Sequence, residues 1–141
     1  MNKSLNPRKK ITIVLLLIFL FGIGGLFIKN KFAKDTHFYQ SLNKQIRLGS
    51  HQISIASLTN FDWEKVYFIG SYNGFKDKEN NTCSSGDYDG AWSLAFTKND
   101  VLVQCIKGKK LSFDRSLKSN TFFSRNSLLV INDKIFNIKE D

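Results

Sequence analysis

The sequence has few of the residues that most often serve as metal ligands or catalytic bases. It contains two histidines, His37 and His51, and two cysteines that form no CxxC pair. A structural zinc site needs about four cysteine or histidine ligands, so we expect no metal, and we expect no other cofactor. The stretch IGSYNG lacks the GxSxG spacing of a nucleophile elbow. We therefore predict no catalytic residue and do not expect an enzyme.

Acidic residues are absent from the first 34 residues, which hold seven basic ones. The whole chain has a net charge of +9, so the remainder, residues 35–141, has a net charge of only +2. The excess of basic residues therefore flanks an apolar run, as membrane anchors require. This distribution argues against a nucleic-acid partner, because binding to phosphates needs basic residues on the folded domain.

The apolar run from Ile11 to Ile28 contains eighteen residues and no charge. A helix of that length spans roughly 27 Å, close to the thickness of a bilayer's hydrocarbon core. The segment that follows, KNKFAKD, lacks the small-residue pattern of a signal-peptidase site. We predict a cytoplasmic basic tail over residues 1–10 and one uncleaved transmembrane signal anchor over 11–28. The protein would lie in a bacterial inner membrane with its C-terminal domain in the periplasm.

The next segment, residues 29–48, is predicted to be a juxtamembrane helical connector. Phe38, Leu42 and Ile46 recur every four residues, and Gly49 follows them as a helix stop. The apolar stripe could pack on the domain or bind a partner helix. We favour packing on the domain.

The remaining residues, 49–141, are predicted to form a β-rich domain, because the apolar period changes from about four to two after Gly49. Together with the connector this gives an α+β fold: a transmembrane helix, an amphipathic helix and a mainly antiparallel sheet of roughly five or six strands. The expected strands are Gln52 to Ala56, Lys65 to Gly70, Ala91 to Thr97, Val101 to Ile106, Leu128 to Ile131 and Ile135 to Ile138.

Two hairpins are expected within this sheet, at the Asn99-Asp100 and Asn132-Asp133 turns. Alternation places Trp92, Leu94 and Phe96 on one face of their strand.

The two cysteines are expected to differ in setting. Cys83 lies in a polar loop, whereas Cys105 lies in a strand, on the face shared with Val101 and Val103. In an exported domain an even pair usually forms a disulfide, which would stabilise this loop by about 3 kcal/mol. The alternative is two unpaired thiols, one buried and one exposed.

The best candidate for contact with a partner is the basic segment from Lys107 to Arg125, in which Asp114 is the single acid. It suits an acidic protein, phospholipid headgroups or an anionic envelope polymer, although a solvated connection between hairpins would look the same. A second candidate is the glycine-containing loop with Tyr72 and Phe75. The predicted basic contact residues are Lys107, Lys109, Lys110, Arg115, Lys118 and Arg125.

The stretch NFDWEKVYFIGSYNGF resembles a pattern of small uncharacterised bacterial envelope proteins, F-x-W-D-[KR]-V-Y-x-x-G-P-Y, at Phe61 to Tyr72. A downstream element, DYDGxWxLxFxK, is similar to Asp87 to Lys98. Here Glu64 replaces the usual Asp and Ser71 the usual Pro. The resemblance implies one exported β-rich domain behind an anchor or signal, and it implies no activity.

These observations favour a membrane-anchored periplasmic binding protein without catalytic activity, with a protein partner in the envelope. A concrete version is an immunity-like inhibitor of a periplasmic toxin, since the layout resembles that of anchored colicin immunity proteins. One alternative is a bitopic accessory subunit of a secretion, division or transport machine. Another is a small envelope hydrolase that uses the acidic residues of the loop from Cys83 to Gly90.

Overall fold

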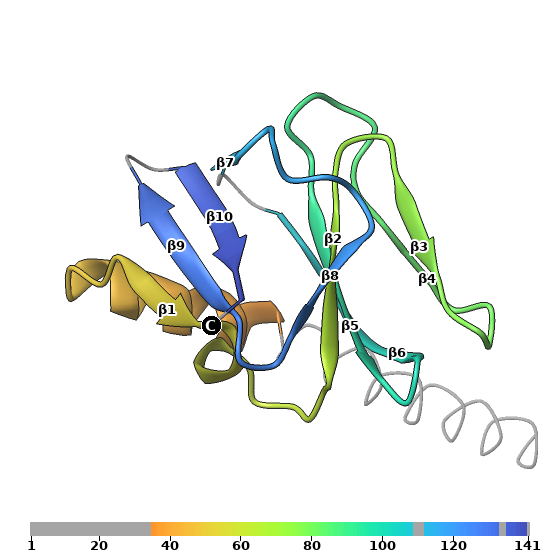
Figure 1. Cartoon of the computed structure of the whole chain (residues 1–141), viewed down its shortest axis with the longest axis horizontal. Helices are drawn as coiled ribbons and strands as arrows, with labels where there is room; N and C mark the ends of the chain where they lie inside the picture. Colours follow the sequence, from red (N-terminus) through yellow and green to blue (C-terminus); the bar gives the residue numbers. More distant parts are fainter. Residues whose placement is uncertain (1–34, 109–111, 133–134, 141) are drawn as a thin grey trace, which may run out of the picture. The chain divides into compact units, whose positions relative to one another are not determined.

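The computed structural model describes residues 35–108, 112–132 and 135–140 (Figure 1). The predicted tail and anchor lie outside these residues, as do Lys109 and Lys110. Within the described part of the chain, no helix is long and apolar enough to cross a membrane.

A helix over residues 35–47 packs its apolar stripe on the domain. Phe38 and Leu42 are buried in the main core, whereas Ile46 remains 38% exposed. The helix ends in a Schellman motif, because the Gly49 N–H donates to the Ile46 carbonyl and the Ser50 N–H to the Gln45 carbonyl. Gly49 adopts a φ of +76°, which a glycine accepts without strain. The predicted glycine stop is confirmed.

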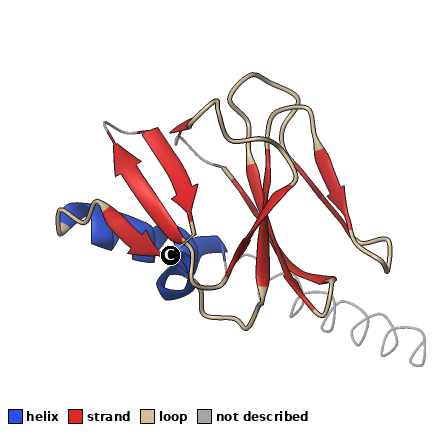
Figure 2. Cartoon of the chain, in the orientation of Figure 1, coloured by secondary structure: helices blue, strands red, loops and turns tan. Residues whose placement is uncertain are grey.

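The strands form two four-stranded sheets and one separate hairpin (Figure 2). The first sheet has the order β1-β9-β10-β7, and its β7–β10 pair is parallel whereas the other pairs are antiparallel. The second sheet, β6-β5-β2-β8, is antiparallel throughout. The α+β class and the mainly antiparallel pairing are confirmed. The strands are β1 (Gln52–Ser54), β2 (Lys65–Ile69), β3 (Gly74–Lys76), β4 (Thr82–Ser84), β5 (Ser93–Lys98), β6 (Val101–Lys107), β7 (Ser112–Phe113), β8 (Thr121–Ser124), β9 (Leu128–Asn132) and β10 (Ile135–Lys139), with a 3-10 turn, η1 (Ile55–Leu58), after β1.

Both predicted hairpins are present. Strands β5 and β6 pair across Asn99 and Asp100, whose φ values of 51° and 59° are those of a type I′ turn. Strands β9 and β10 pair after Asn132. The prediction of one sheet with five or six strands was too simple, because the strands divide between two sheets and β3, β4, β7 and β8 were not predicted.

The main core lies between the two four-stranded sheets and the helix. The predicted face of β5 is confirmed, since Trp92, Leu94 and Phe96 all belong to this core. Phe96 has no exposed surface, and its ring centroid lies 5.0 Å from that of Trp63 and 5.2 Å from that of Phe61. The first sheet contributes Ile53, Leu129, Phe136 and Ile138.

A second, smaller core lies on the opposite face of the second sheet, where the β3–β4 hairpin packs (Figure 1). Cys83 of β4 and Cys105 of β6 lie there at disulfide-bonding distance, with Cα atoms 5.5 Å apart. The pair is therefore consistent with the predicted disulfide.

The expected neighbours of Cys105 were wrong. A register shift in the β5–β6 pair makes Phe96 oppose Gln104 and Thr97 oppose Leu102, so Val103 is an extra residue. Val103 consequently packs against the main core, and Cys105 shares its side with Leu102.

The β3–β4 hairpin is also fastened by Asp77, which is only 8% exposed. Burial raises the pKa of this carboxyl, but the hydrogen bonds that it accepts from Leu102, Asn81 and Glu79 outweigh burial and lower the pKa to about 2. Because the folded-state pKa is below the unfolded one, this group stabilises the fold above about pH 4 and loses that contribution as the pH falls toward 2.

We expect Asp77→Asn to lower the urea midpoint at neutral pH, because an amide cannot accept the same set of hydrogen bonds. The difference between the native protein and the variant should shrink from about pH 7 to about pH 3. Urea denaturation followed by circular dichroism checks this, with the exposed Asp87→Asn as the control. A difference that does not change with pH would contradict the assignment.

Candidate binding groove

A groove of about 960 Å³ opens at the end of the domain where β2 finishes and β10 begins. Four segments far apart in the sequence line it: the turn after β2, the loop before β5, β7 with the turn that follows it, and the first residue of β10. The principal lining residues are Phe68, Ser71, Asp89, Trp92, Phe113, Asp114, Arg115 and Ile135.

The apolar part of the groove is made of aromatic rings that pack against one another edge-on or tilted. The Phe113 centroid lies 4.6 Å from that of Trp92 and 4.9 Å from that of Phe68. Gly108 packs directly on the Trp92 indole, since a Cβ at this position would lie 2.3 Å from the ring. The Gly108 N–H also donates to the Trp92 carbonyl at 2.7 Å. These contacts hold the indole in a fixed position.

The charged part of the lining consists of Asp89, Asp114 and Arg115. The Ser116 N–H donates to the Asp114 carboxylate at 2.8 Å, and this hydrogen bond holds the pKa of Asp114 below its usual value. Asp114 is therefore a fixed anion at neutral pH. The Arg115 side chain is exposed.

The two loops beside the groove are tied together by serine hydroxyls. Ser71 Oγ donates to the Ala91 carbonyl and accepts from the Gly90 N–H, both at 3.0 Å. Ser85 Oγ donates to the Gly70 carbonyl at 2.7 Å. The turn after β2 and the loop before β5 therefore form one connected surface.

The structure brings some of the predicted contact residues to this surface and places others elsewhere. Arg115 lines the groove, and Tyr72 follows the lining residue Ser71 in the sequence. Lys118 is exposed in the turn that leads to β8. Lys107 ends β6, where its carbonyl accepts a hydrogen bond from the Tyr39 hydroxyl.

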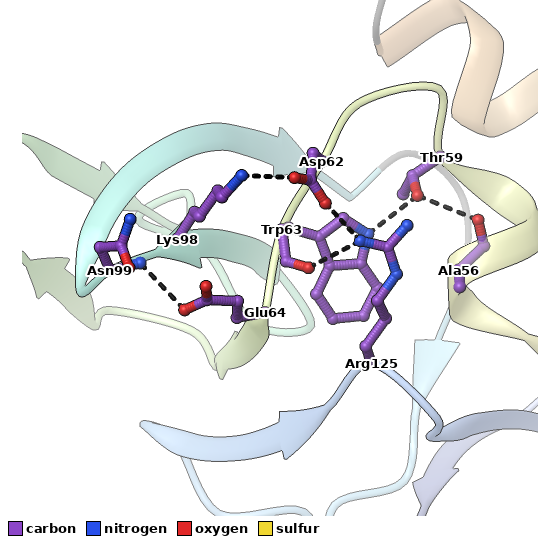
Figure 3. A network of polar contacts seen from close by, with 8 residues as sticks. All are labelled: Ala56, Thr59, Asp62, Trp63, Glu64, Lys98, Asn99 and Arg125. Carbon is purple, nitrogen blue, oxygen red and sulfur yellow. Dashed lines mark hydrogen bonds and ion pairs between the residues drawn. The ribbon is translucent and has the colours of Figure 1, made fainter.

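The other predicted aromatic and basic residues have structural contacts. Phe75 lies half-buried against Tyr67, with ring centroids 4.6 Å apart. Arg125 pairs with the Asp62 carboxylate and donates to the Trp63 carbonyl (Figure 3).

Asp62, Trp63 and Glu64, which lie just before β2, belong to a polar network (Figure 3). The groove lies at the other end of this strand, at Phe68 and Gly70. The Asp62 carboxylate binds Lys98 and Arg125, and these hydrogen bonds lower the pKa of Asp62. The Glu64 carboxylate accepts the Asn99 N–H at 3.0 Å and so fastens the β5–β6 turn. These acids organise the fold.

Sequence reasoning missed most of the groove. Trp92 was assigned only to the core, and Phe113 and Ile135 were not assigned to any site. One available signal was Asp114, the single acid in a basic segment.

Compared with known proteins, the chain matches no family model, no curated protein and no solved structure.

Proposed function

We propose that the chain is a non-catalytic binding protein of the bacterial envelope that captures a protein partner in its groove. In this proposal residues 11–28 anchor it in the inner membrane and the described domain faces the periplasm. The observation that supports binding is the groove, where rigid aromatic rings, a fixed carboxylate and an exposed guanidinium meet from three separate segments: β2, the loop before β5, and β7 with the turn after it. Aromatic anchors with a polar rim are characteristic of protein interfaces.

The size and the openness of the groove favour a segment of a macromolecule over a small ligand. A volume of about 960 Å³ lies at the upper end of the range for small-molecule sites. The lining residue Ile135 is 48% exposed, and Tyr72, which follows the lining residue Ser71 in the sequence, is 64% exposed. A protein segment would cover these side chains.

A concrete form of the proposal is an immunity-like inhibitor. A membrane tether would keep such an inhibitor at a high local concentration where a periplasmic toxin acts. The alternative, an accessory subunit of an envelope machine, would use the same groove. Gene neighbourhood separates the two, because a toxin gene would lie beside the first and a machinery operon beside the second.

The hydrolase alternative has some support from Asp89, which lines the groove. However, the neighbouring hydroxyl of Ser71 is engaged with the backbone of Gly90 and Ala91. Those hydrogen bonds hold the loops together and leave the hydroxyl poorly placed for nucleophilic attack. Binding is therefore the better account.

The test is a pull-down with the tagged full-length protein in detergent. We expect the groove variant Arg115→Glu, Ile135→Asp to retain at least about tenfold less partner than the native protein, because it reverses a charge and places another on exposed apolar surface. The predicted lysines are tested by charge reversal at Lys109 and Lys110.

The matched control is Arg47→Glu, Leu48→Asp, which makes the same kinds of change at exposed positions near the end of the helix. It should retain the partner fully. Equal capture by the groove variant and the native protein would contradict the proposal, and so would a native protein that reproducibly retains nothing.

A further inference from the structure

Two exposed tyrosines are sequence neighbours of groove-lining residues: Tyr72 follows Ser71, and Tyr88 precedes Asp89. Tyr72 is 64% exposed and Tyr88 is 60% exposed. Both adjoin Gly86: the Tyr72 N–H donates to the Gly86 carbonyl, and the Tyr88 ring packs so closely that a Cβ on Gly86 would lie 2.5 Å from it. We call Tyr72, Asp87, Tyr88 and Asp89 the tyrosine platform.

The backbone beneath the platform is well connected. Besides the serine hydrogen bonds described above, the Ser85 N–H donates to the Asn73 carbonyl and the Ala91 N–H to the Tyr88 carbonyl. Tyr72 is held in the left-handed region, with a φ of 59°. A tyrosine on such a fixed backbone has only its two side-chain torsions left to order when a partner covers it.

The platform is also acidic. The loop from Cys83 to Trp92 contains no lysine or arginine, and neither does the turn from Gly70 to Phe75. Asp87 and Asp89 are exposed, and within the described residues neither carboxylate forms an ion pair. Arg115 lines the groove together with Asp89, but a partner that contacts this loop still meets two exposed carboxylates that form no ion pair within the described residues.

We propose that the tyrosine platform binds a lysine- or arginine-rich segment of the partner protein. Guanidinium and ammonium groups stack on tyrosine rings and pair with carboxylates, so one class of side chain satisfies both features of the surface. This inference rests on the proposed binding function and adds the chemistry of the partner. It predicts that the platform attracts cations even though the whole chain has a net charge of +9.

The test measures binding of a short peptide of alternating arginine and serine to the immobilised full-length protein in detergent. The comparison peptides replace arginine with uncharged citrulline or with glutamate. We expect only the arginine peptide to bind, with an affinity that falls as ionic strength rises. Two double variants should each weaken binding of the arginine peptide by at least about tenfold. One is Tyr72→Ala with Tyr88→Ala, and the other is Asp87→Asn with Asp89→Asn.

Two further variants make the result decisive. Tyr72→Gly keeps the left-handed backbone without strain, so the thermal midpoint of unfolding should be unchanged or higher. The same variant should bind the arginine peptide more weakly. The control Phe122→Ala removes a comparably exposed aromatic residue from β8 and should bind normally.

Equal binding of the citrulline peptide, or arginine binding that none of the platform variants weakens, would overturn the inference. The pull-down described above separates this failure from failure of the proposed function. Capture that is lost in the groove variant but retained by the platform variants would leave the binding function standing and remove the platform from it.

Discussion

Replacing Trp63 with alanine should lower the free energy of unfolding by about 3–5 kcal/mol, the largest effect that we expect from one substitution. The Trp63 side chain has no exposed surface and packs edge-on against Phe96 in the middle of the main core. Its indole N–H donates to Thr59 Oγ1 at 2.9 Å, so the truncation also removes one of the two hydrogen bonds of that hydroxyl, which still donates to the Ala56 carbonyl. Alanine would leave a cavity that neighbouring rings cannot fill.

The measurement is urea denaturation of the full-length protein in detergent, followed by circular dichroism. Trp63→Phe should lower the free energy of unfolding by less than Trp63→Ala does, because most of the ring volume remains. Phe122→Ala, at an exposed position, should change the free energy of unfolding by less than about 1 kcal/mol. A Trp63→Ala variant as stable as this control would show that Trp63 is not central to the core.

Replacing both cysteines with serine should lower the free energy of unfolding by about 3 kcal/mol, the second large effect that we expect. Cys83 and Cys105 join the β3–β4 hairpin to β6, and both side chains are buried in the smaller core. Without the bond the unfolded chain gains entropy, and the hairpin keeps fewer restraints on the face of the sheet. Urea denaturation of the native protein with and without reductant should reproduce the loss.

The same cysteines report on the proposed compartment. When bacterial cells are denatured directly in a thiol-alkylating reagent, which exposes the buried sulfurs, the native protein should remain unlabelled until it is reduced, because disulfides persist in the periplasm. A version without residues 2–33 should be labelled directly. Labelling of the native protein without reduction would contradict export of the domain.

Local patterns in the sequence predicted the parts of the fold that depend on neighbouring residues. The Asn99-Asp100 turn, the helix stop at Gly49 and the alternation in β5 each depend on a few adjacent positions, and each is present in the structure. Strand β7 is different, because its two residues, Ser112 and Phe113, pair in parallel with a strand more than twenty residues away. Such a strand has no recognisable period of its own.

The groove was not predictable for the same reason. Phe113 and Arg115 reach the groove because β7 pairs with β10, whereas Asp89 and Trp92 come from the loop before β5. Charge counting along the chain treated Lys107 to Arg125 as one surface, but the fold directs Arg125 to the far end of β2, where it binds Asp62. A segment that is continuous in sequence need not form a continuous surface.

Two links hold the β3–β4 hairpin to β6, and they are broken by different chemical conditions. Reductant would break the bond between Cys83 and Cys105 but leave the Asp77 carboxylate on the Leu102 N–H. Strong acid would protonate Asp77 but leave the sulfur link intact. We therefore expect the hairpin to stay docked through a redox change alone or an acid shock alone, and to loosen most when both occur together.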